Sequence, residues 1–335
     1  MKRIFIITGA DGFLGNNIIR KLECDRENQI RALVLPGSQA RSLEGLNCTI
    51  YRGDVTKPAT LGEVFTLPAG AEVYVIHCAA IVYIKTKYNP LMQEVNVNGT
   101  LNVAKRTLET GAKMVYVSSV HAITEKPDGE AMTEIGVFEP EKVEGQYAKT
   151  KAETANRLLA MTREEGLNAC IVHPSGLIGP NDFGSSHLTQ LVIDCINGRL
   201  IAGVKGGYDF ADVRDVADGI ISACFNGKKG ECYILSNRYI EIKELLAAIT
   251  AAGGKKPVKH ILPMWIAKLT APLAELYYAL LKQPPLYTRY SLYTLGSNAR
   301  FCNDKAKREL GYKTRPLEDT LRDTVAWLEE HGRIK

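Results

Sequence analysis

Hydrophobic residues in the first half of the chain fall into short runs separated by longer stretches in which they recur at helical spacing. Short apolar runs predict strands buried on both faces, as in a parallel sheet. These runs lie at 4–7, 30–35, 49–52, 73–78, 114–117 and 169–172. Helical spacing predicts helices over 16–23, 92–109 and 146–165. The alternation predicts an α/β fold with a doubly wound parallel sheet and right-handed crossovers.

Three glycines, Gly9, Gly12 and Gly15, separate the first predicted strand from the first predicted helix. In such a turn the first glycine permits a tight bend, the second lets the backbone approach a pyrophosphate, and the third lets the helix pack on the strand. The free N–H groups at the start of the helix would face the phosphates. Glycine clusters elsewhere are ordinary turns, but this position between strand and helix predicts a dinucleotide site.

The pattern changes after His173-Pro174-Ser175, where proline and glycine become frequent and the predicted elements become mostly helical. A helix over 212–225 begins with an Asp212 cap, and a strand over 232–235 returns to the sheet. We therefore expect a Rossmann-type cofactor-binding domain from 1–173 together with 211–237. Segments 174–210 and 238–335 would form a smaller, mostly helical substrate-binding lobe, with the substrate in the cleft between the two parts.

Composition narrows the class of protein. The 335 residues are 45% apolar and 24% charged, with a net charge of +5 and no Lys/Arg block longer than a pair, so no nucleic-acid surface is indicated. Eight cysteines form no C-x-x-C pair, which favours buried free thiols in a reducing compartment. The first strand starts so near Met1 that no signal peptide is expected, and the protein is predicted to be cytoplasmic.

One apolar stretch, 261–281, is interrupted by Pro263, Lys268, Pro272 and Glu275. It falls short of the roughly 20 apolar residues that a membrane-spanning helix needs. We expect helices of the second lobe here, with a peripheral membrane contact as the alternative.

Tyr147 and Lys151 stand four positions apart on a predicted helix, so their side chains share one face. A neighbouring ammonium would favour the phenolate and lower the tyrosine pKa from its usual value of about 10. Ser119, at the end of the fifth strand, can hydrogen-bond the same substrate oxygen. Tyr-x-x-x-Lys spacing also occurs on ordinary helix faces, but here it coincides with the glycine turn and the serine. The combination predicts proton transfer to a carbonyl while hydride arrives from a nicotinamide.

Several further stretches stand at the ends of the predicted strands or on the helices that follow. They are Thr8-Gly9-Ala10-Asp11-Gly12-Phe13-Leu14-Gly15, Gly53-Asp54-Val55, His77-Cys78-Ala79-Ala80, Asn96-Val97-Asn98-Gly99-Thr100, Ser118-Ser119, Tyr147-x-x-x-Lys151, His173-Pro174-Ser175, Phe210-x-Asp212-Val213-x-Asp215 and Glu309-Leu310-Gly311-Tyr312. In this order they resemble the extended short-chain dehydrogenases/reductases, the NAD-dependent epimerase/dehydratase superfamily. Within it the chain is most similar to the dihydroflavonol 4-reductase-like and 3β-hydroxysteroid dehydrogenase-like branch.

The resemblance implies roles for individual residues. Tyr147 would be the acid/base, Lys151 would bind the nicotinamide ribose, and Ser119, or Ser118 if the register differs by one, would orient the carbonyl. The cofactor would be held by Gly9, Asp11, Gly12, Phe13, Leu14, Gly15, Ser38, Arg41, Asp54, Val55, Cys78, Ala79, Ala80, Tyr147, Lys151, Pro174 and Ser175. Asn96 and Asn98 are either caps or site-shaping residues. His121 either contacts substrate or is an ordinary loop histidine.

Cofactor preference depends on the end of the second strand, where a carboxylate would bind a ribose 2′-hydroxyl and an arginine would bind a 2′-phosphate. The stretch from Leu35 to Arg41 contains no Asp or Glu and ends in that arginine, which favours NADP(H). Relatives that prefer NADP often carry a basic residue where this chain has Leu35, so NAD(H) remains the alternative. No metal site is expected.

Three functions are compatible with these residues. The first is an NAD(P)(H)-dependent oxidoreductase acting on a carbonyl or secondary alcohol of a small, moderately apolar substrate. The tyrosines at 277, 278, 287 and 290 suit such a substrate, although core packing explains them equally well. The second is a nucleotide-sugar epimerase with tightly bound NAD, which Tyr208 disfavours because such epimerases usually carry Arg at this position. The third is a non-enzymatic module that senses the cofactor. Members of the family that the chain resembles often form homodimers, but the sequence leaves the oligomeric state open.

Overall fold

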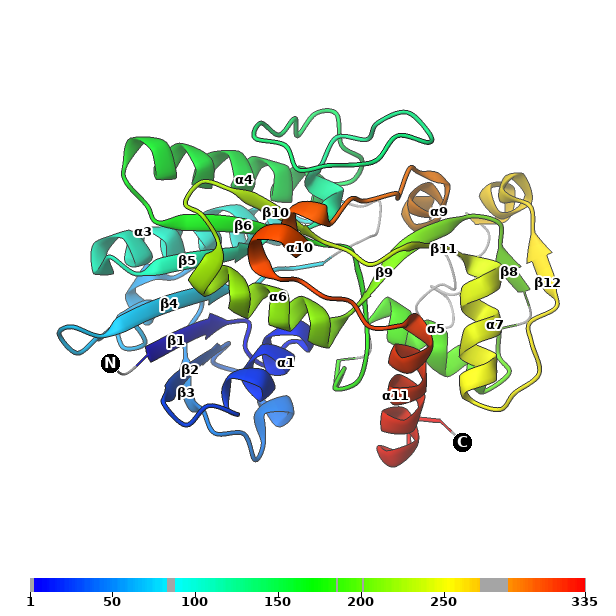
Figure 1. The fold of residues 1–335 in the computed structure, drawn as a ribbon, viewed down its shortest axis with the longest axis horizontal. Helices are drawn as coiled ribbons and strands as arrows, with labels where there is room; N and C mark the ends of the chain where they lie inside the picture. Colours follow the sequence, from blue (N-terminus) through cyan, green and yellow to red (C-terminus); the bar gives the residue numbers. More distant parts are fainter. Residues whose placement is uncertain (1–2, 83–87, 185, 201, 272–288, 335) are drawn as a thin grey trace.

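A computed structural model describes residues 3–82, 88–184, 186–200, 202–271 and 289–334 (Figure 1). Its centre is a seven-stranded parallel sheet in the order β10-β6-β5-β4-β1-β2-β3. The strands are β1 (Arg3–Thr8), β2 (Asn28–Val34), β3 (Thr49–Arg52), β4 (Glu72–His77), β5 (Lys113–Val117), β6 (Ala169–Pro174) and β10 (Cys232–Leu235). The order changes direction between β1 and β4, where a doubly wound sheet opens a crevice for ligands. The predicted Rossmann-type fold is confirmed.

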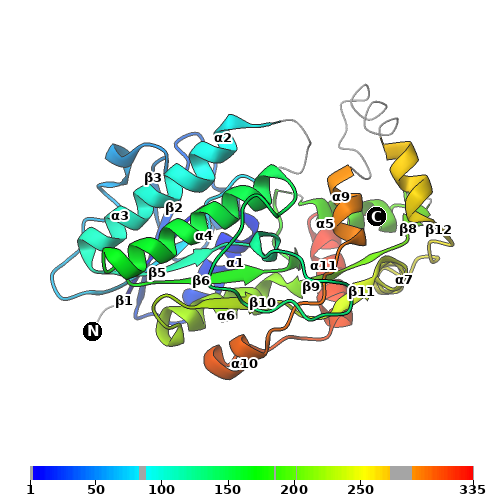
Figure 2. The same ribbon diagram turned by 90° about the horizontal axis from the view of Figure 1, so that it is seen from above.

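Helices cover both faces of this sheet. Figure 2 shows α3 (Thr100–Thr110) and α4 (Gln146–Glu164) on one face, and α1 (Phe13–Leu22) with α6 (Val213–Asn226) on the other. Each pair of helices buries its apolar side in a separate core cluster. The inner strands are therefore covered on both sides, which explains why their sequences read as apolar runs, whereas the edge strand β3 is mostly exposed.

The helix predicted over 92–109 is divided. It consists of α2 (Pro90–Gln93), a π-helical turn η3 (Glu94–Gly99) and α3. The carbonyl of Asn96 accepts hydrogen bonds from the hydroxyls of Thr100, at 2.8 Å, and Thr154, at 2.9 Å. At this π-helical turn the bond from Thr154 connects the carbonyl of Asn96 to α4. The helix predicted from Asn16 begins three residues earlier, at Phe13.

Outside the large sheet the chain contains more strands than the sequence pattern predicted. The strands β7 (Gly176–Ile178), β9 (Gly207–Asp212) and β11 (Tyr239–Glu241) form one small sheet, and β8 (Ala202–Val204) pairs with β12 (His260–Leu262). Most of them are three residues long, too short to show an alternating pattern. The helices of this part are α5 (His187–Ile196), α7 (Ile242–Ala252), α9 (Arg289–Gly296), α10 (Asp304–Leu310) and α11 (Leu317–Glu330). The tyrosines at 277, 278 and 287 lie outside the described residues.

The cap predicted for α6 is confirmed, since Asp212 accepts a hydrogen bond from the backbone N–H of Arg214 at 2.7 Å. The same carboxylate pairs with the Arg214 guanidinium at 2.7 Å, and Arg214 also reaches Asp323 on α11 at 2.8 Å. Arg315, just before α11, binds Asp215 at 2.7 Å. These ion pairs attach the C-terminal helix to α6 and to the end of β9.

All eight cysteines are free, and half of them are buried, as predicted. Among the described residues no helix is long and apolar enough to cross a membrane.

Candidate active site

The glycine turn has the geometry that the sequence predicted. Gly9 adopts a left-handed φ of +63°, and a Cβ there would lie 2.8 Å from the backbone of Ala79. Gly15 lies against Gly9 and Ala10, so a Cβ would collide with the Gly9 carbonyl oxygen and lie 2.9 Å from the Ala10 Cα. Gly12 is the N-cap of α1, and a Cβ there would lie only 3.1 Å from the Gly9 carbonyl oxygen. Side chains are therefore excluded where the backbone must meet a ligand.

The N-terminus of α1 fits a pyrophosphate. Gly12 provides no side-chain cap, and the first turn, which Phe13 and Leu14 begin, carries no acidic residue. The helix therefore presents backbone N–H groups and a positive dipole end without an internal anion. Asn16 donates to the carbonyls of Gly12 at 2.8 Å and Asn181 at 3.1 Å, which holds the turn from behind. No sequence pattern pointed to Asn16, because its partner is 165 residues away.

The loop after β2 is tied to the glycine turn. The hydroxyl of Ser38 donates to the Asp11 carboxylate, and Ser42 donates to the Asp11 carbonyl at 2.8 Å. Arg41 begins a short 3₁₀ turn, η1 (Arg41–Leu43), with an exposed side chain. Arg52, which the sequence reasoning did not consider, donates to the Ser38 carbonyl at 2.8 Å. Arg41 thus lies in the loop, Arg52 bonds the loop from the end of β3, and the Asp11 carboxylate beside it is already bonded.

Asp54 and Val55 follow β3 at the same edge of the sheet. One carboxylate oxygen of Asp54 accepts from the N–H of Thr56 at 3.0 Å and from its hydroxyl at 2.8 Å. Val55 is buried against Gly99, and a Cβ added to Gly99 would lie 2.7 Å from a methyl group of Val55. Cys78, Ala79 and Ala80 follow β4 and are partly exposed beside the glycine turn.

A buried histidine joins the strands that carry these segments. His77 Nδ1 lies 2.7 Å from the Thr8 hydroxyl, and Nε2 lies 2.8 Å from the Thr100 hydroxyl. Burial, together with the charge of Lys151, lowers the pKa of His77 to about 3, so the ring is neutral at physiological pH. The Thr8 hydroxyl also accepts from the N–H of Ala79 at 3.2 Å. The neutral His77 ring, bonded to two hydroxyls, therefore connects the ends of β1 and β4 with the start of α3.

Asn96 connects the segment after β4 to α4. Its side chain forms two hydrogen bonds with the backbone of Ile81, at 2.8 and 3.1 Å, and one with the Thr150 hydroxyl at 3.1 Å. The structure therefore gives Asn96 a site-shaping position. Asn98 instead is exposed and bonds Glu94 at 2.7 Å.

Tyr147, Lys151 and Ser119 come together at the start of α4. Ser119 caps the 3₁₀ turn η4 (Val120–Ala122), and its hydroxyl hydrogen-bonds the Tyr147 phenol. The Lys151 ammonium lies 5.9 Å from the centre of the Tyr147 ring and donates to the Val117 carbonyl at 2.7 Å. Ser118 is buried and its side chain lies toward Tyr116, so Ser119 is the serine beside the phenol.

The charges of this group differ from the sequence prediction. Burial raises the pKa of Tyr147 to about 12, and the hydrogen bond from Ser119 offsets only part of that rise. Burial lowers the pKa of Lys151 to about 7. The expectation that the lysine lowers the tyrosine pKa was wrong for this geometry, because the ammonium is itself desolvated and bonds Val117 rather than the phenol. Tyr147 is a protonated hydrogen donor at neutral pH.

Pro174 ends β6, and Ser175 follows it nearly buried beside Asp209 of β9. Asp209 is fully buried, which raises its pKa to about 6, and it accepts from the N–H of Asn237 at 2.8 Å. The end of β6 is thus joined to the small sheet of the second part of the chain.

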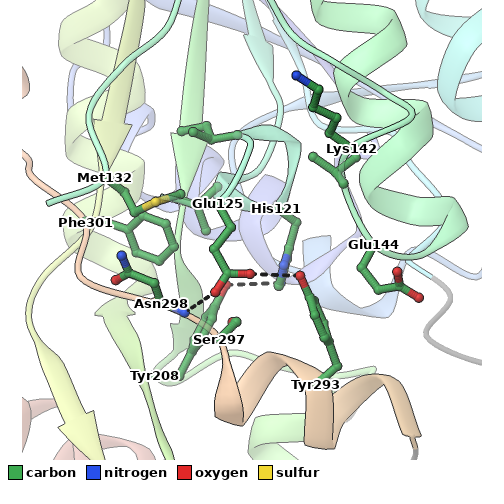
Figure 3. A pocket seen from close by; sticks show the side chains of 13 residues that line it. His121, Glu125, Met132, Lys142, Glu144, Tyr208, Tyr293, Ser297, Asn298 and Phe301 are labelled. Carbon is green, nitrogen blue, oxygen red and sulfur yellow. Dashed lines mark hydrogen bonds between the residues drawn. The ribbon is translucent and has the colours of Figure 1, made fainter. Parts of the chain in front are cut away.

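A pocket of about 40 Å³, drawn in Figure 3, lies against η4. It is lined by Val120, His121, Ile123, Glu125, Met132, Lys142, Val143, Glu144, Tyr208, Tyr293, Ser297, Asn298 and Phe301. Glu125 accepts hydrogen bonds from the Tyr293 hydroxyl at 2.9 Å and the Asn298 backbone N–H at 2.5 Å. The sequence pattern did not indicate Glu125, Tyr293 or Asn298 as neighbours, because α9 and the residues after it meet the η4 region only in the folded chain.

His121 forms the wall between this pocket and the phenol. Its Nε2 lies 3.1 Å from the Tyr208 hydroxyl, the two rings stack at 5.6 Å, and the Tyr147 ring is 6.3 Å away. Burial lowers the pKa of His121 to about 4, so the ring is neutral. Tyr290 lies 5.9 Å from His121 and covers Gly145, where a Cβ would collide with its ring. The rings of His121, Tyr208 and Tyr290 therefore lie around the approach to Tyr147.

Residues 5–236 match the model of the NAD dependent epimerase/dehydratase family. The chain is 28% identical to "Sterol demethylase protein B" of Methylococcus capsulatus, covering 98% of this chain and 99% of that one. It is 29% identical to "4-hydroxy-2-methyl-3-oxo-4-farnesyl-3,4-dihydroquinoline-1-oxide ketoreductase" of Stigmatella aurantiaca, covering 92% and 91%. Relatives named for dihydroflavonol 4-reductase and 3β-hydroxysteroid dehydrogenase are also similar.

Solved structures agree with this assignment. The structure titled "Crystal structure of gox2253" matches at a TM-score of 0.85 and 33% identity, covering 99% of both chains. A nucleoside-diphosphate-sugar epimerase from Pseudomonas aeruginosa matches at a TM-score of 0.79 and 20% identity, which shows a shared fold. The family match spans most of the chain and includes the glycine turn, Ser119, Tyr147 and Lys151. This chain belongs to the NAD-dependent epimerase/dehydratase family.

Proposed function

We propose that this protein is an NADP(H)-linked reductase or dehydrogenase that interconverts a carbonyl and a secondary alcohol on a small, moderately apolar substrate. The observation that carries the proposal is the meeting of Tyr147, Ser119 and Lys151 at the edge of the sheet where the glycine turn lies. Relatives named as ketoreductase and hydroxysteroid dehydrogenase support an oxidoreductase.

Each residue has a role that follows from its surroundings. A nicotinamide bound beside Tyr147 supplies or accepts the hydride. In reduction, Tyr147 gives its phenolic proton to the carbonyl oxygen as the carbon gains hydride, so a pKa of about 12 keeps the donor loaded at neutral pH. Ser119 donates to the same oxygen and holds it in line. Lys151, when protonated, would hydrogen-bond the nicotinamide ribose, and the phenolate that remains regains its proton from solvent.

The cofactor would be held by residues that lie along one edge of the sheet. The N-terminus of α1 would bind the pyrophosphate, Asp54 and Val55 would flank the adenine, and Ser175 would lie near the nicotinamide. Arg41, with Arg52 behind it, favours a ribose 2′-phosphate, because bidentate guanidinium–phosphate bonds are strong and no free carboxylate stands at the end of β2.

The approach to Tyr147 favours a substrate with a flat or apolar body. His121, Tyr208 and Tyr290 present ring faces, and the neutral imidazole adds no charge. The sterol and farnesyl-quinoline names of two relatives are consistent with such a substrate.

A nucleotide-sugar epimerase is the second candidate, and its fold is the same. Tyr208 opposes it, because it is 5% exposed and its hydroxyl is bonded to His121, so it offers no charge to a diphosphate. Tightly held NAD that copurifies, with no net turnover of added cofactor, would favour the epimerase instead.

Tyr147→Phe tests the proposal directly. Turnover should be followed by the absorbance of reduced nicotinamide in a screen of ketones, aldehydes and alcohols with all four nicotinamide nucleotides. The variant should lose about 10²- to 10⁴-fold in turnover and retain cofactor affinity, since only the proton donor is removed. Tyr51→Phe on β3 is the matched control and should behave as the wild type. Unchanged turnover in Tyr147→Phe would refute the assignment.

A further inference from the structure

A helix whose described residues are 264–271 carries large apolar side chains on its outer face. Trp265 and Leu269 are 67% and 72% exposed, although apolar side chains of this size are usually covered. They are four residues apart, so they point the same way from the helix. In Figures 1 and 2 this helix, coloured gold, stands beside β8 and β12 at the end of the molecule opposite the edge that holds the N-terminus.

The inner face of the same helix is packed. Ala267 and Ala271 are fully buried in a cluster with Val204 of β8 and Leu292 of α9. Leu295 of α9 and Met264 close this cluster. Ala267 and Ala271 therefore hold the helix against β8 and α9, and Trp265 and Leu269 lie on its other, exposed face.

The chain segment that contains this helix is basic. Between Glu244 and Glu275 the chain contains four lysines and no acidic residue. Lys268 is exposed between Trp265 and Leu269, and Lys259 is exposed just before β12, which leads into the helix. Tryptophan and leucine flanked by lysine suit the boundary between headgroups and acyl chains, where the rings and methyl groups enter and the ammonium groups meet phosphate.

We propose that the outer face of the 264–271 helix docks on a lipid bilayer that carries anionic headgroups. Two side chains are too small an apolar area for a stable protein interface, whereas two apolar anchors with basic neighbours suffice for reversible attachment to a membrane surface. The neighbouring helix, α9, carries Tyr293 of the pocket and Tyr290 beside His121. Docking therefore places the bilayer one helix away from the approach to Tyr147, the side from which an apolar substrate would arrive.

Vesicle binding by the full chain tests the proposal without any turnover assay. The chain has two tryptophans, and Trp327 is 8% exposed and packed on His331 at 4.3 Å. Trp327→Phe therefore leaves Trp265 as the only indole reporter. We expect its emission to shift to the blue, and the protein to sediment, with vesicles of equal phosphatidylcholine and phosphatidylglycerol but much less with phosphatidylcholine alone.

Variants identify the surface. Trp265→Ser with Leu269→Ser should weaken sedimentation at least about tenfold, and Lys268→Glu should weaken it about fivefold. Val137→Ser, at a side chain that is 74% exposed elsewhere, is the control and should bind as the wild type. Absence of binding to anionic vesicles, or equal binding by the double variant, would overturn the proposal. A dimer that the double variant dissociates would assign the face to a second copy and overturn it as well.

Discussion

Replacing Gly15 with alanine is the sharpest test of how the glycine turn works. The new Cβ would collide with the Gly9 carbonyl oxygen and lie 2.9 Å from the Ala10 Cα, about 0.5 Å closer than ordinary van der Waals contact begins. Both atoms belong to the backbone, so no side chain can rotate away. Either α1 moves off β1 or the turn opens.

The magnitude follows from that displacement. Overpacking of this kind costs about 1–3 kcal/mol in the free energy of unfolding. The helix N-terminus also shifts from its position for a pyrophosphate, so nicotinamide dinucleotide affinity should fall about tenfold or more. Thermal unfolding and calorimetric titration with NADP⁺ measure the two effects separately.

The control is Gly37→Ala in the adjoining loop. No heavy atom lies within 4 Å of a Cβ at Gly37, so this variant should match the wild type in both assays. Gly12→Ala, with its Cβ 3.1 Å from the Gly9 oxygen, should fall between them. Wild-type stability and affinity in Gly15→Ala would refute the view that close packing here shapes the cofactor site.

Three further predictions concern charge and packing. Because burial lowers the Lys151 pKa to about 7, the reduction rate should fall as pH rises through about 7, and Lys151→Met should flatten the pH–rate profile. In the unfolded chain Lys151 keeps its proton up to its usual pKa of 10.5, whereas in the folded chain it loses the proton at about pH 7. The free energy of unfolding of the wild type should therefore rise between about pH 7 and 10.5 because of this lysine. Thermal melts of Lys151→Met should lack that rise. Arg41→Ala should weaken NADP⁺ binding about tenfold while NAD⁺ binding stays within about twofold; equal loss for both nucleotides in titrations would remove the 2′-phosphate role. Asn96→Ala should cost about 2–4 kcal/mol in denaturant unfolding because it leaves the Ile81 N–H unpaired, whereas Asn98→Ala should cost less than about 0.5 kcal/mol; similar values would contradict the bridging role.

Local pattern determined much of this protein. Burial on both faces makes β1 and β10 apolar runs, so both strands could be located from neighbouring residues alone. The glycine turn was equally visible, because Gly9 and Gly15 meet restrictions within a few residues of themselves. The Asp212 cap of α6 depends on a bond two residues away. Such features are local in the chain, and local spacing records them.

Tertiary structure decided the rest. His121 and Tyr208 are 87 residues apart, and Asn96 reaches Thr150 across 54, so no spacing could reveal either pair. The short strands β7 and β8 exist because they have partners, since three residues carry no periodic signal. Protonation also depended on the fold. The sequence placed Tyr147 and Lys151 on one helix face and predicted a lowered tyrosine pKa. Desolvation instead raises the pKa of Tyr147 and lowers that of Lys151. Burial is a property of the assembled chain, and it governs which groups carry charge.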